Sequence, residues 1–104
     1  MANYWNNQLM LPAPELIGVM TGSNVSIGTL LYNPVKLILD NQSSEPVVLL
    51  ISFDNGVTLI SWHTFPAGEA IILDDDLYSF PAGTQFFGNG ASGNFSISYT
   101  YLKL

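Results

Sequence analysis

Near its carboxyl end the chain alternates apolar and polar side chains with a period of two, and this pattern constrains the fold more than any other feature. Phe95, Ile97, Tyr99 and Tyr101 are separated by serine or threonine. A β-strand has this period, because successive side chains point to opposite faces of the sheet. Similar runs recur between clusters of glycine, proline and asparagine, and no segment has the period of a helix. We therefore expect an all-β protein.

The spacing of these runs predicts a single antiparallel β-sandwich or jelly-roll-like domain of about seven or eight strands over residues 16–104. A chain of 104 residues is long enough for one such domain. Residues 1–15 contain Pro12 and Pro14 and lack the alternation, so we expect them to form an extended N-terminal arm. The strands are expected near residues 25–32, 35–40, 46–54, 57–62, 69–74, 84–88 and 94–102.

Two kinds of turn are predicted between these strands. Asn55 and Gly56 predict a hairpin, because a two-residue type I′ turn needs positive φ at both central positions. The sequence Phe-Pro-Ala-Gly occurs twice, at residues 65–68 and 80–83. Proline at the second position and glycine at the fourth fit a type I turn, so the two copies are expected to form equivalent corners of the domain.

The run from Val47 to Phe53 is apolar on both faces, which is typical of a central strand or of a strand whose outer face is covered. We expect one phase of this run to point into the core, and Val47, Leu49 and Ile51 on the other phase to belong to an interface. The residues expected to be mostly buried hold the apolar phase of their strands: Leu37, Leu39, Val48, Leu50, Leu59, Ile72, Phe86, Ile97 and Tyr99.

Charge is scarce: eight acidic residues and two lysines make up 10% of the chain, where about 25% is usual, and the net charge is −6. Lys36 and Lys103 cannot neutralise a phosphate backbone, so nucleic-acid binding is excluded as the main task. The first residues lack the basic and apolar regions of a signal peptide. The longest apolar stretch has five residues, whereas a membrane helix needs about 20. We expect a protein made in the cytoplasm, without a membrane partner.

Few residues suggest chemistry. There is no cysteine, and His63, the only histidine, belongs to no nucleophile motif and cannot build a zinc site alone. Asp74, Asp75 and Asp76 form the one cluster of charge. Solvent, a calcium ion or a basic partner could relieve their repulsion, and the sequence leaves these readings open, although the run lacks the pattern of a known calcium loop. We predict no catalytic residue, no cofactor and no metal site, and therefore no enzyme.

The scarcity of charge favours an assembly component over a plain acidic β-domain with uncharged loops. A surface of asparagine, serine, threonine and glutamine suits burial by another protein, because a desolvated charge costs far more than a neutral group that keeps its hydrogen bonds. Tyr4 and Trp5 are expected either to anchor the arm on a neighbouring subunit or to fold back on their own sandwich. Asp74, Asp75 and Asp76 are expected at the rim of the interface.

Several segments carry a resemblance to a known family. Leu37–Asn41, Pro46–Gly56 and Phe65–Asp74, continued by Ala82–Thr84 and Ser96–Tyr99, resemble the small β-sandwich virion proteins of tailed bacteriophages. In such proteins a strand with Ser-Phe-Asp-Gly leads to a polar hairpin, an Ala-Gly turn and a closing strand. This chain departs from that pattern, because an asparagine stands between the aspartate and the glycine of the hairpin.

The resemblance implies a non-enzymatic role on the virion, as a capsid decoration, head–tail connector or fibre-attachment protein. It also implies a homo-oligomer, with a trimer preferred, in contact with other virion proteins. The alternative is a small carbohydrate- or ligand-binding β-sandwich, in which Trp62, Tyr78 or Tyr99 would stack on the ligand. Composition does not separate the two hypotheses, because aromatic and apolar residues serve both.

Overall fold

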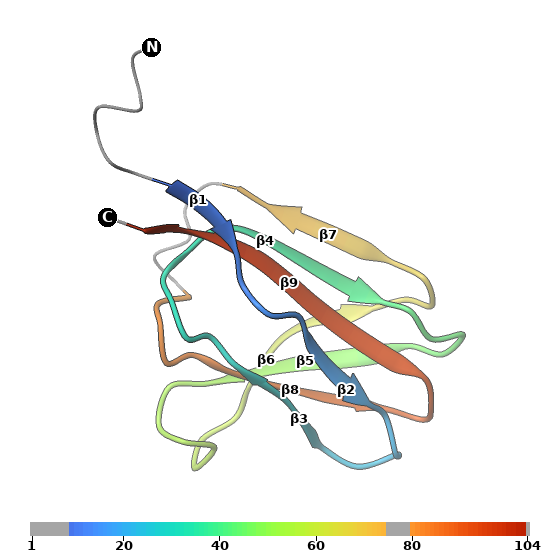
Figure 1. Cartoon of the computed structure of the whole chain (residues 1–104). Coiled ribbons are helices and arrows are strands. Elements are labelled where there is room, and N and C mark those ends of the chain that lie inside the picture. Colours follow the sequence, from blue (N-terminus) through green and yellow to red (C-terminus); the bar gives the residue numbers. More distant parts are fainter. Residues whose placement is uncertain (1–8, 75–79, 104) are drawn as a thin grey trace.

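A computed structural model describes residues 9–74 and 80–103, and these residues form nine strands in two antiparallel sheets packed face to face (Figure 1). The first sheet contains β1, β2, β4, β7 and β9, and the second contains β3, β5, β6 and β8. The strands are β1 (Leu9–Pro12), β2 (Leu16–Val19), β3 (Val25–Thr29), β4 (Pro34–Asn41), β5 (Val47–Ser52), β6 (Ile60–Phe65), β7 (Ala70–Leu73), β8 (Gln85–Gly90) and β9 (Asn94–Lys103).

The order of the strands is that of a jelly roll. In the first sheet β1 and β2 lie one after the other along β9, which is followed by β4 and β7, and the second sheet has the order β3-β8-β5-β6. Apart from β1–β2 and the β5–β6 hairpin, each pair of consecutive strands is divided between the two sheets. A chain that crosses in this way builds the two interlocked Greek keys of a jelly roll. The prediction of an antiparallel sandwich or jelly roll is confirmed.

The start of the sandwich differs from the prediction. Residues 9–12, assigned to an extended arm, form β1, and the strand β2 was not expected. Both strands pair with β9, in an unbroken register from Leu9 to Pro12 and again from Leu16 to Val19. Proline is compatible with an edge strand, because the edge does not require every N–H for the ladder. Pro12 therefore ends an edge strand and Pro14 lies in the link between β1 and β2, and neither indicates that a strand is absent.

The predicted hairpin turn is confirmed. Asn55 and Gly56 have φ of 61° and 83°, and β5 and β6 pair antiparallel. The loop is wider than expected, because the strands end at Ser52 and begin again at Ile60. The Ser52 hydroxyl accepts from the N–H of Gly56 at 2.8 Å, and the Asp54 carboxylate accepts from the N–H of Thr58 at 2.8 Å. The hydrogen bonds that Asp54 accepts from Thr58, followed by the one from the Ser52 hydroxyl, lower the pKa of Asp54.

The two Phe-Pro-Ala-Gly corners are equivalent, but the turn in each begins one residue later than predicted. The N–H of Glu69 donates to the carbonyl of Pro66 at 3.0 Å, and the N–H of Thr84 donates to that of Pro81 at 3.1 Å. The glycine is therefore the third residue of the turn and has positive φ, 75° at Gly68 and 95° in the second copy. A type I turn does not allow this φ, whereas a type II turn requires it.

The register predicted for β5 is wrong. Val47, Leu49 and Ile51 are buried in the core, while Val48 and Leu50 are half-buried on the outer face. Because this strand is apolar on both faces, periodicity alone could not choose between them. The choice depends on β8, where glycines 88 and 90 face the core. A Cβ at Gly90 would lie 2.7 Å from Val47, so these small residues make room for the large ones on β5.

The remaining core predictions are mostly confirmed. Phe86, Ile97 and Tyr99 are buried, as are Leu37 and Leu39. Two predictions fail: Leu59 is only half-buried, and Ile72 is exposed. Ile72 lies on the outer face because its neighbours on β7, Ile71 and Leu73, point toward the core.

Asn41, at the end of β4, is a fully buried polar residue whose side-chain nitrogen and oxygen are both hydrogen-bonded. Its amide nitrogen donates to the backbone carbonyls of Glu45, Phe65 and Pro66 at 2.9, 3.1 and 3.0 Å. Its Oδ1 accepts from the N–H and the hydroxyl of Ser43 at 3.0 and 2.8 Å. One side chain thus joins the β4–β5 crossover to the β6–β7 corner.

The register of β5 can be tested with two neighbouring leucines. We expect Leu49→Ala to lower the free energy of unfolding by about 2–5 kcal/mol, because the side chain is fully buried. Leu50→Ala removes the same atoms from the half-buried outer face, so it should cost clearly less. Urea denaturation of the two variants measures the difference, and a larger loss for Leu50→Ala would contradict this register.

Candidate functional site

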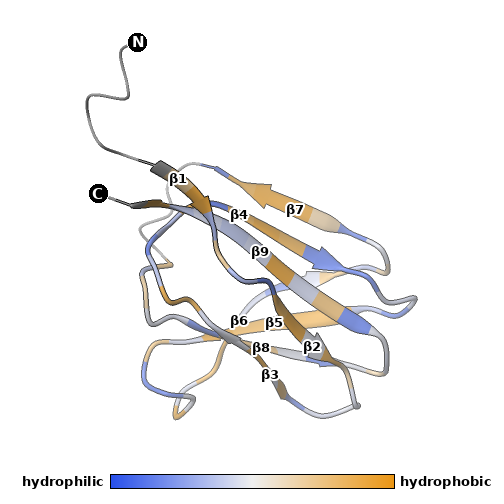
Figure 2. Cartoon of the chain, in the orientation of Figure 1, coloured by the Kyte–Doolittle hydropathy of each residue, from blue (hydrophilic) through white to orange (hydrophobic). Residues whose placement is uncertain are grey.

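The outer face of the first sheet carries apolar residues from all five of its strands. Figure 2 colours much of β2, β4 and β7 as hydrophobic. The register places Ile38 of β4 between Ile72 of β7 and Ser98 of β9. Met10 of β1 lies opposite Leu102 of β9. We call the following residues the apolar outer face: Met10, Ile17, Val19, Ile38, Ile72 and Leu102.

Five of these six side chains are largely exposed. The exposed fractions are 63% for Met10, 52% for Ile17, 62% for Val19, 58% for Ile72 and 42% for Leu102. They are half of the ten large apolar residues that are exposed in the described part of the chain. Scattered apolar residues are normal on a surface, whereas several large ones on one sheet favour a surface that contacts something else. Here they lie in three groups, Met10 with Leu102, Ile17 with Val19, and Ile38 with Ile72, on either side of the serine and threonine residues of β9.

The polar residues on the same face are nearly all uncharged. In its described strands the face carries two charged side chains, Lys36 and Asp40, and the β9 positions between them and the edge are Ser96, Ser98 and Thr100. The Asp40 carboxylate accepts a hydrogen bond from the Gln42 amide at 3.3 Å. Covering this face with protein would therefore desolvate few charges, which removes the largest cost of forming an interface.

The predicted interface residues lie elsewhere. Val47, Leu49 and Ile51 are in the core of the sandwich, so a contact on β5 would have to use Val48 and Leu50 instead. Asp74 is exposed directly after β7. The other predicted interface residues, Tyr4, Trp5, Asp75 and Asp76, lie outside the described residues. Prediction missed the apolar outer face because half of it belongs to β1 and β2, whose short apolar runs are separated by prolines.

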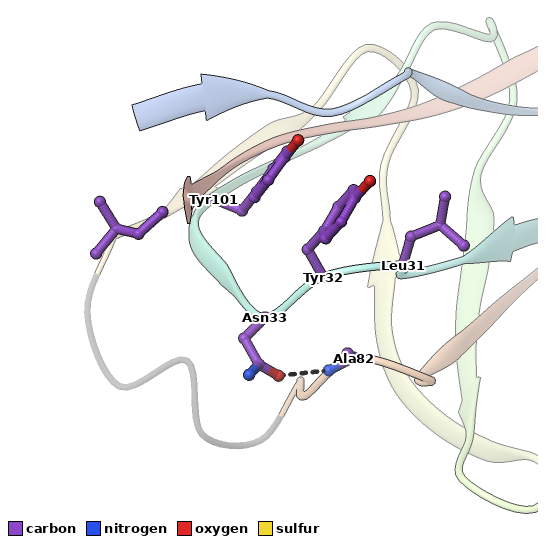
Figure 3. A pocket seen from close by; sticks show the side chains of 6 residues that line it. Leu31, Tyr32, Asn33, Ala82 and Tyr101 are labelled. Atoms are coloured by element: carbon purple, nitrogen blue, oxygen red, sulfur yellow. Dashed lines mark hydrogen bonds between the residues drawn. The ribbon is translucent and has the colours of Figure 1, made fainter. Parts of the chain in front are cut away.

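A second feature is a shallow hollow of about 470 Å³ at one end of the sandwich. Tyr32, between β3 and β4, and Tyr101, on β9, stack in it with ring centroids 3.8 Å apart and an angle of 9° between the rings (Figure 3). Leu31 and Leu102 line the same hollow. The Asn33 side chain closes one side, since its Oδ1 accepts from a backbone N–H at the second Phe-Pro-Ala-Gly corner at 2.8 Å.

The hollow is neutral. Partial desolvation, followed by the hydrogen bond to Tyr32 and the neighbouring phenols, raises the pKa of Tyr101 above its usual value of 10.0. Tyr101 can therefore offer a hydroxyl group beside an apolar surface. Tyr32 remains 41% exposed, so part of this pair is accessible.

Of the aromatic residues predicted to stack on a ligand, Tyr99 is not accessible and Trp62 is only partly so. Tyr99 is buried, and its hydroxyl accepts from the N–H of Leu31 at 2.9 Å. Trp62 is half-buried, with its ring centroid 5.6 Å from that of Phe80. Tyr78 lies outside the described residues. The stacked pair was missed because its two tyrosines are 69 positions apart and only the fold brings them together.

His63 makes contacts that stabilise the fold. Its Nε2 lies 2.8 Å from a carboxylate oxygen of Glu69, which follows the first Phe-Pro-Ala-Gly corner. Its ring meets the edge of Phe65 at 4.7 Å between centroids. The histidine sits beside a β-bulge at Trp62, where the pairing of β5 with β6 shifts by one residue. This contact links an edge strand to the following corner.

The described residues contain no group of three or more histidine, aspartate or glutamate side chains placed to hold a metal ion. Within the same residues, no helix is long and apolar enough to cross a membrane. No family model matches this chain, and neither a curated protein nor a solved structure matches it. The arguments about function therefore rest on the fold and on the two surfaces described above.

Proposed function

We propose that this protein is a non-enzymatic structural component of a tailed-bacteriophage virion that acts through protein–protein assembly. It would work as a capsid decoration, a head–tail connector or a fibre-attachment protein, in contact with other virion proteins. We propose that it assembles as a homo-oligomer, with a trimer preferred. The observation that carries the assembly role is the apolar outer face of the first sheet, while the assignment to a virion rests on the sequence resemblance.

The physical argument is one of burial. Covering exposed apolar area stabilises a complex by roughly 25 cal/mol per Å², before the cost of association is subtracted. Five large side chains of the apolar outer face are exposed, and the described strands of the same sheet place only two charged side chains beside them. Left uncovered, such a face would promote aggregation. The jelly-roll strand order is compatible with this role, because capsid proteins are among the proteins that use it.

The assembly role is tested by placing a charge on the apolar outer face of the full chain. We expect the unaltered protein to sediment at a multiple of 11.3 kDa and Ile17→Lys to shift toward that single-chain mass, because a buried, unpaired ammonium opposes assembly. Val57→Lys is the matched control, since Val57 is 84% exposed on the hairpin, away from this face. A variant lacking residues 1–8, which spares β1, tests the contribution of Tyr4 and Trp5.

The assembly role would be contradicted by a full chain that remains monomeric at high micromolar concentration. The virion assignment has its own test, which is mass spectrometry of purified phage particles. The absence of this chain from the purified particles would contradict the virion assignment.

A second candidate function is binding of a neutral carbohydrate, and the specific observation that favours it is the stacked Tyr32–Tyr101 pair. Sugar rings have apolar faces that pack on aromatic rings, and their hydroxyl groups suit a hollow lined by phenols and an amide. Lectins also use the jelly roll.

A glycan array read with the full chain tests this second candidate. Tyr32→Ala should abolish binding of any neutral glycan that the unaltered protein retains, because half of the stacked platform is removed. Phe53→Ala serves as the control, since it removes an exposed aromatic ring that does not line the hollow. Binding that survives Tyr32→Ala, or an array without a bound glycan, would remove this candidate.

A further inference from the structure

The free edges of the two sheets differ in how they are protected against pairing with another strand. β3 and β6 both contain register shifts, near Ile27 and Trp62, and β1 ends in Pro12. β2 is covered by β3, which approaches so closely that a Cβ at Gly18 would lie 2.7 Å from the Ile27 side chain. Bulges, prolines and covering strands are the usual means of blocking a sheet edge.

The edge strand β7 has none of these protections. Its four residues, Ala70–Leu73, contain neither proline nor charge, and they pair with β4 in an unbroken register. Among the described strands, only β4 contacts β7 extensively. β7 therefore presents a regular and uncharged edge, at the border of the first sheet in Figure 1.

The hydrogen-bond phase shows which backbone groups are free for pairing. The N–H of Asn41 donates to the carbonyl of Glu69 at 2.9 Å, which makes this a hydrogen-bonded pair of the β4–β7 ladder. Hydrogen-bonded pairs alternate in an antiparallel ladder, so Ile71 and Leu73 also direct their backbone groups to β4. The N–H and carbonyl groups of Ala70 and Ile72 consequently point away from the sheet. The Ile72 side chain, 58% exposed, lies beside them.

The charges at both ends of β7 indicate what would pair with it. Glu69 precedes the strand and Asp74 follows it. In an antiparallel pair of two β7 strands from two copies, Glu69 of one copy would approach Asp74 of the other at both ends, and like charges oppose such pairing. A segment with cationic residues at its ends would instead find a carboxylate at each end of the strand, since Asp74 is exposed and Glu69 is half-buried, with one oxygen 2.8 Å from His63 Nε2.

We propose that the edge of β7 binds an extended segment of a partner protein by adding it to the first sheet as a further strand. The segment would place aliphatic residues at alternate positions, to lie beside Ile72, and lysine or arginine at its ends. This is strand addition, in which main-chain hydrogen bonds supply affinity and alternate side chains supply specificity. The inference deepens the proposed assembly role, on which it rests, by naming a surface and the chemistry of its partner.

The probe is a library of random short peptides, selected in parallel on the full chain and on Ile72→Pro. Proline removes the outward N–H at this position and leaves the bonds of Ile71 and Leu73 to β4 in place. We expect peptides with alternating aliphatic residues and cationic ends to be enriched on the unaltered protein, and to bind Ile72→Pro at least about tenfold more weakly. Ile72→Thr, which keeps the N–H and the branched Cβ, is the matched control and should retain the same peptides.

A second measurement on the unaltered protein does not depend on the folding of Ile72→Pro. In NMR hydrogen exchange, the amide protons of Ala70 and Ile72 should exchange rapidly in the free protein and become protected when a selected peptide is added. Three results would overturn the inference. They are no enrichment over Ile72→Pro, enriched peptides without cationic ends, or protection of these amides that rises with protein concentration alone, which would identify a second copy as the occupant.

Failure of this inference can be told apart from failure of the assembly role. If Ile17→Lys dissociates the oligomer while selected peptides bind Ile72→Pro as well as the unaltered protein, the assembly role stands and the edge of β7 is not the partner site. If peptides bind as proposed while the full chain stays monomeric, the edge of β7 is a binding site and the proposed self-assembly is contradicted.

Discussion

The buried side-chain amide of Asn41 is the interaction on which the arrangement of the sheets depends. Its two amide protons are shared among three backbone carbonyls, and two of these, those of Glu45 and Pro66, lie outside the strands where the chain leaves one sheet for the other. A jelly roll crosses between its sheets repeatedly, and each crossing leaves backbone groups that must be satisfied. Removing the amide would leave the buried carbonyl of Phe65 and the part-buried carbonyls of Glu45 and Pro66 without this donor at once, which is costly.

With the segments between the sheets fixed by hydrogen bonds, the inward-facing side chains of the strands fill the core. Leu37 and Leu39 on β4 face Leu49 and Val47 on β5 across one continuous core, and glycines on β8 provide the space. A core that is satisfied within a single chain leaves the outward phase free to serve another purpose. In the first sheet that phase exposes five large apolar side chains beside two charged ones, whereas in the second its large apolar side chains, Val48, Leu50 and Phe87, are half-buried. The first sheet therefore offers the more exposed apolar surface to a partner.

The features that depend on local sequence were predictable, and those that depend on packing were not. Asn55 and Gly56 determine their turn through their own backbone preferences, and the alternation on β9 determines its own faces, so both predictions hold. β5 has no polar residue from Val47 to Ile51 to mark its outer face, so its register was decided by glycines on β8 that are distant in sequence. The apolar outer face and the stacked tyrosine pair were not predicted from the sequence, for the same reason. Neither the apolar outer face nor the Tyr32–Tyr101 stack exists until strands far apart in the sequence are paired.

The proposed assembly role requires that the apolar outer face of the first sheet is covered by protein when the protein functions. Hydroxyl-radical footprinting of the full chain, read residue by residue at low and at high protein concentration, measures this most directly. We expect the reactivity of Met10, Ile17 and Leu102 to fall together as concentration rises, while that of Val57 and Phe53 on the hairpin stays unchanged. Equal reactivity of the apolar outer face at both concentrations, or protection of the hairpin in its place, would contradict the claim.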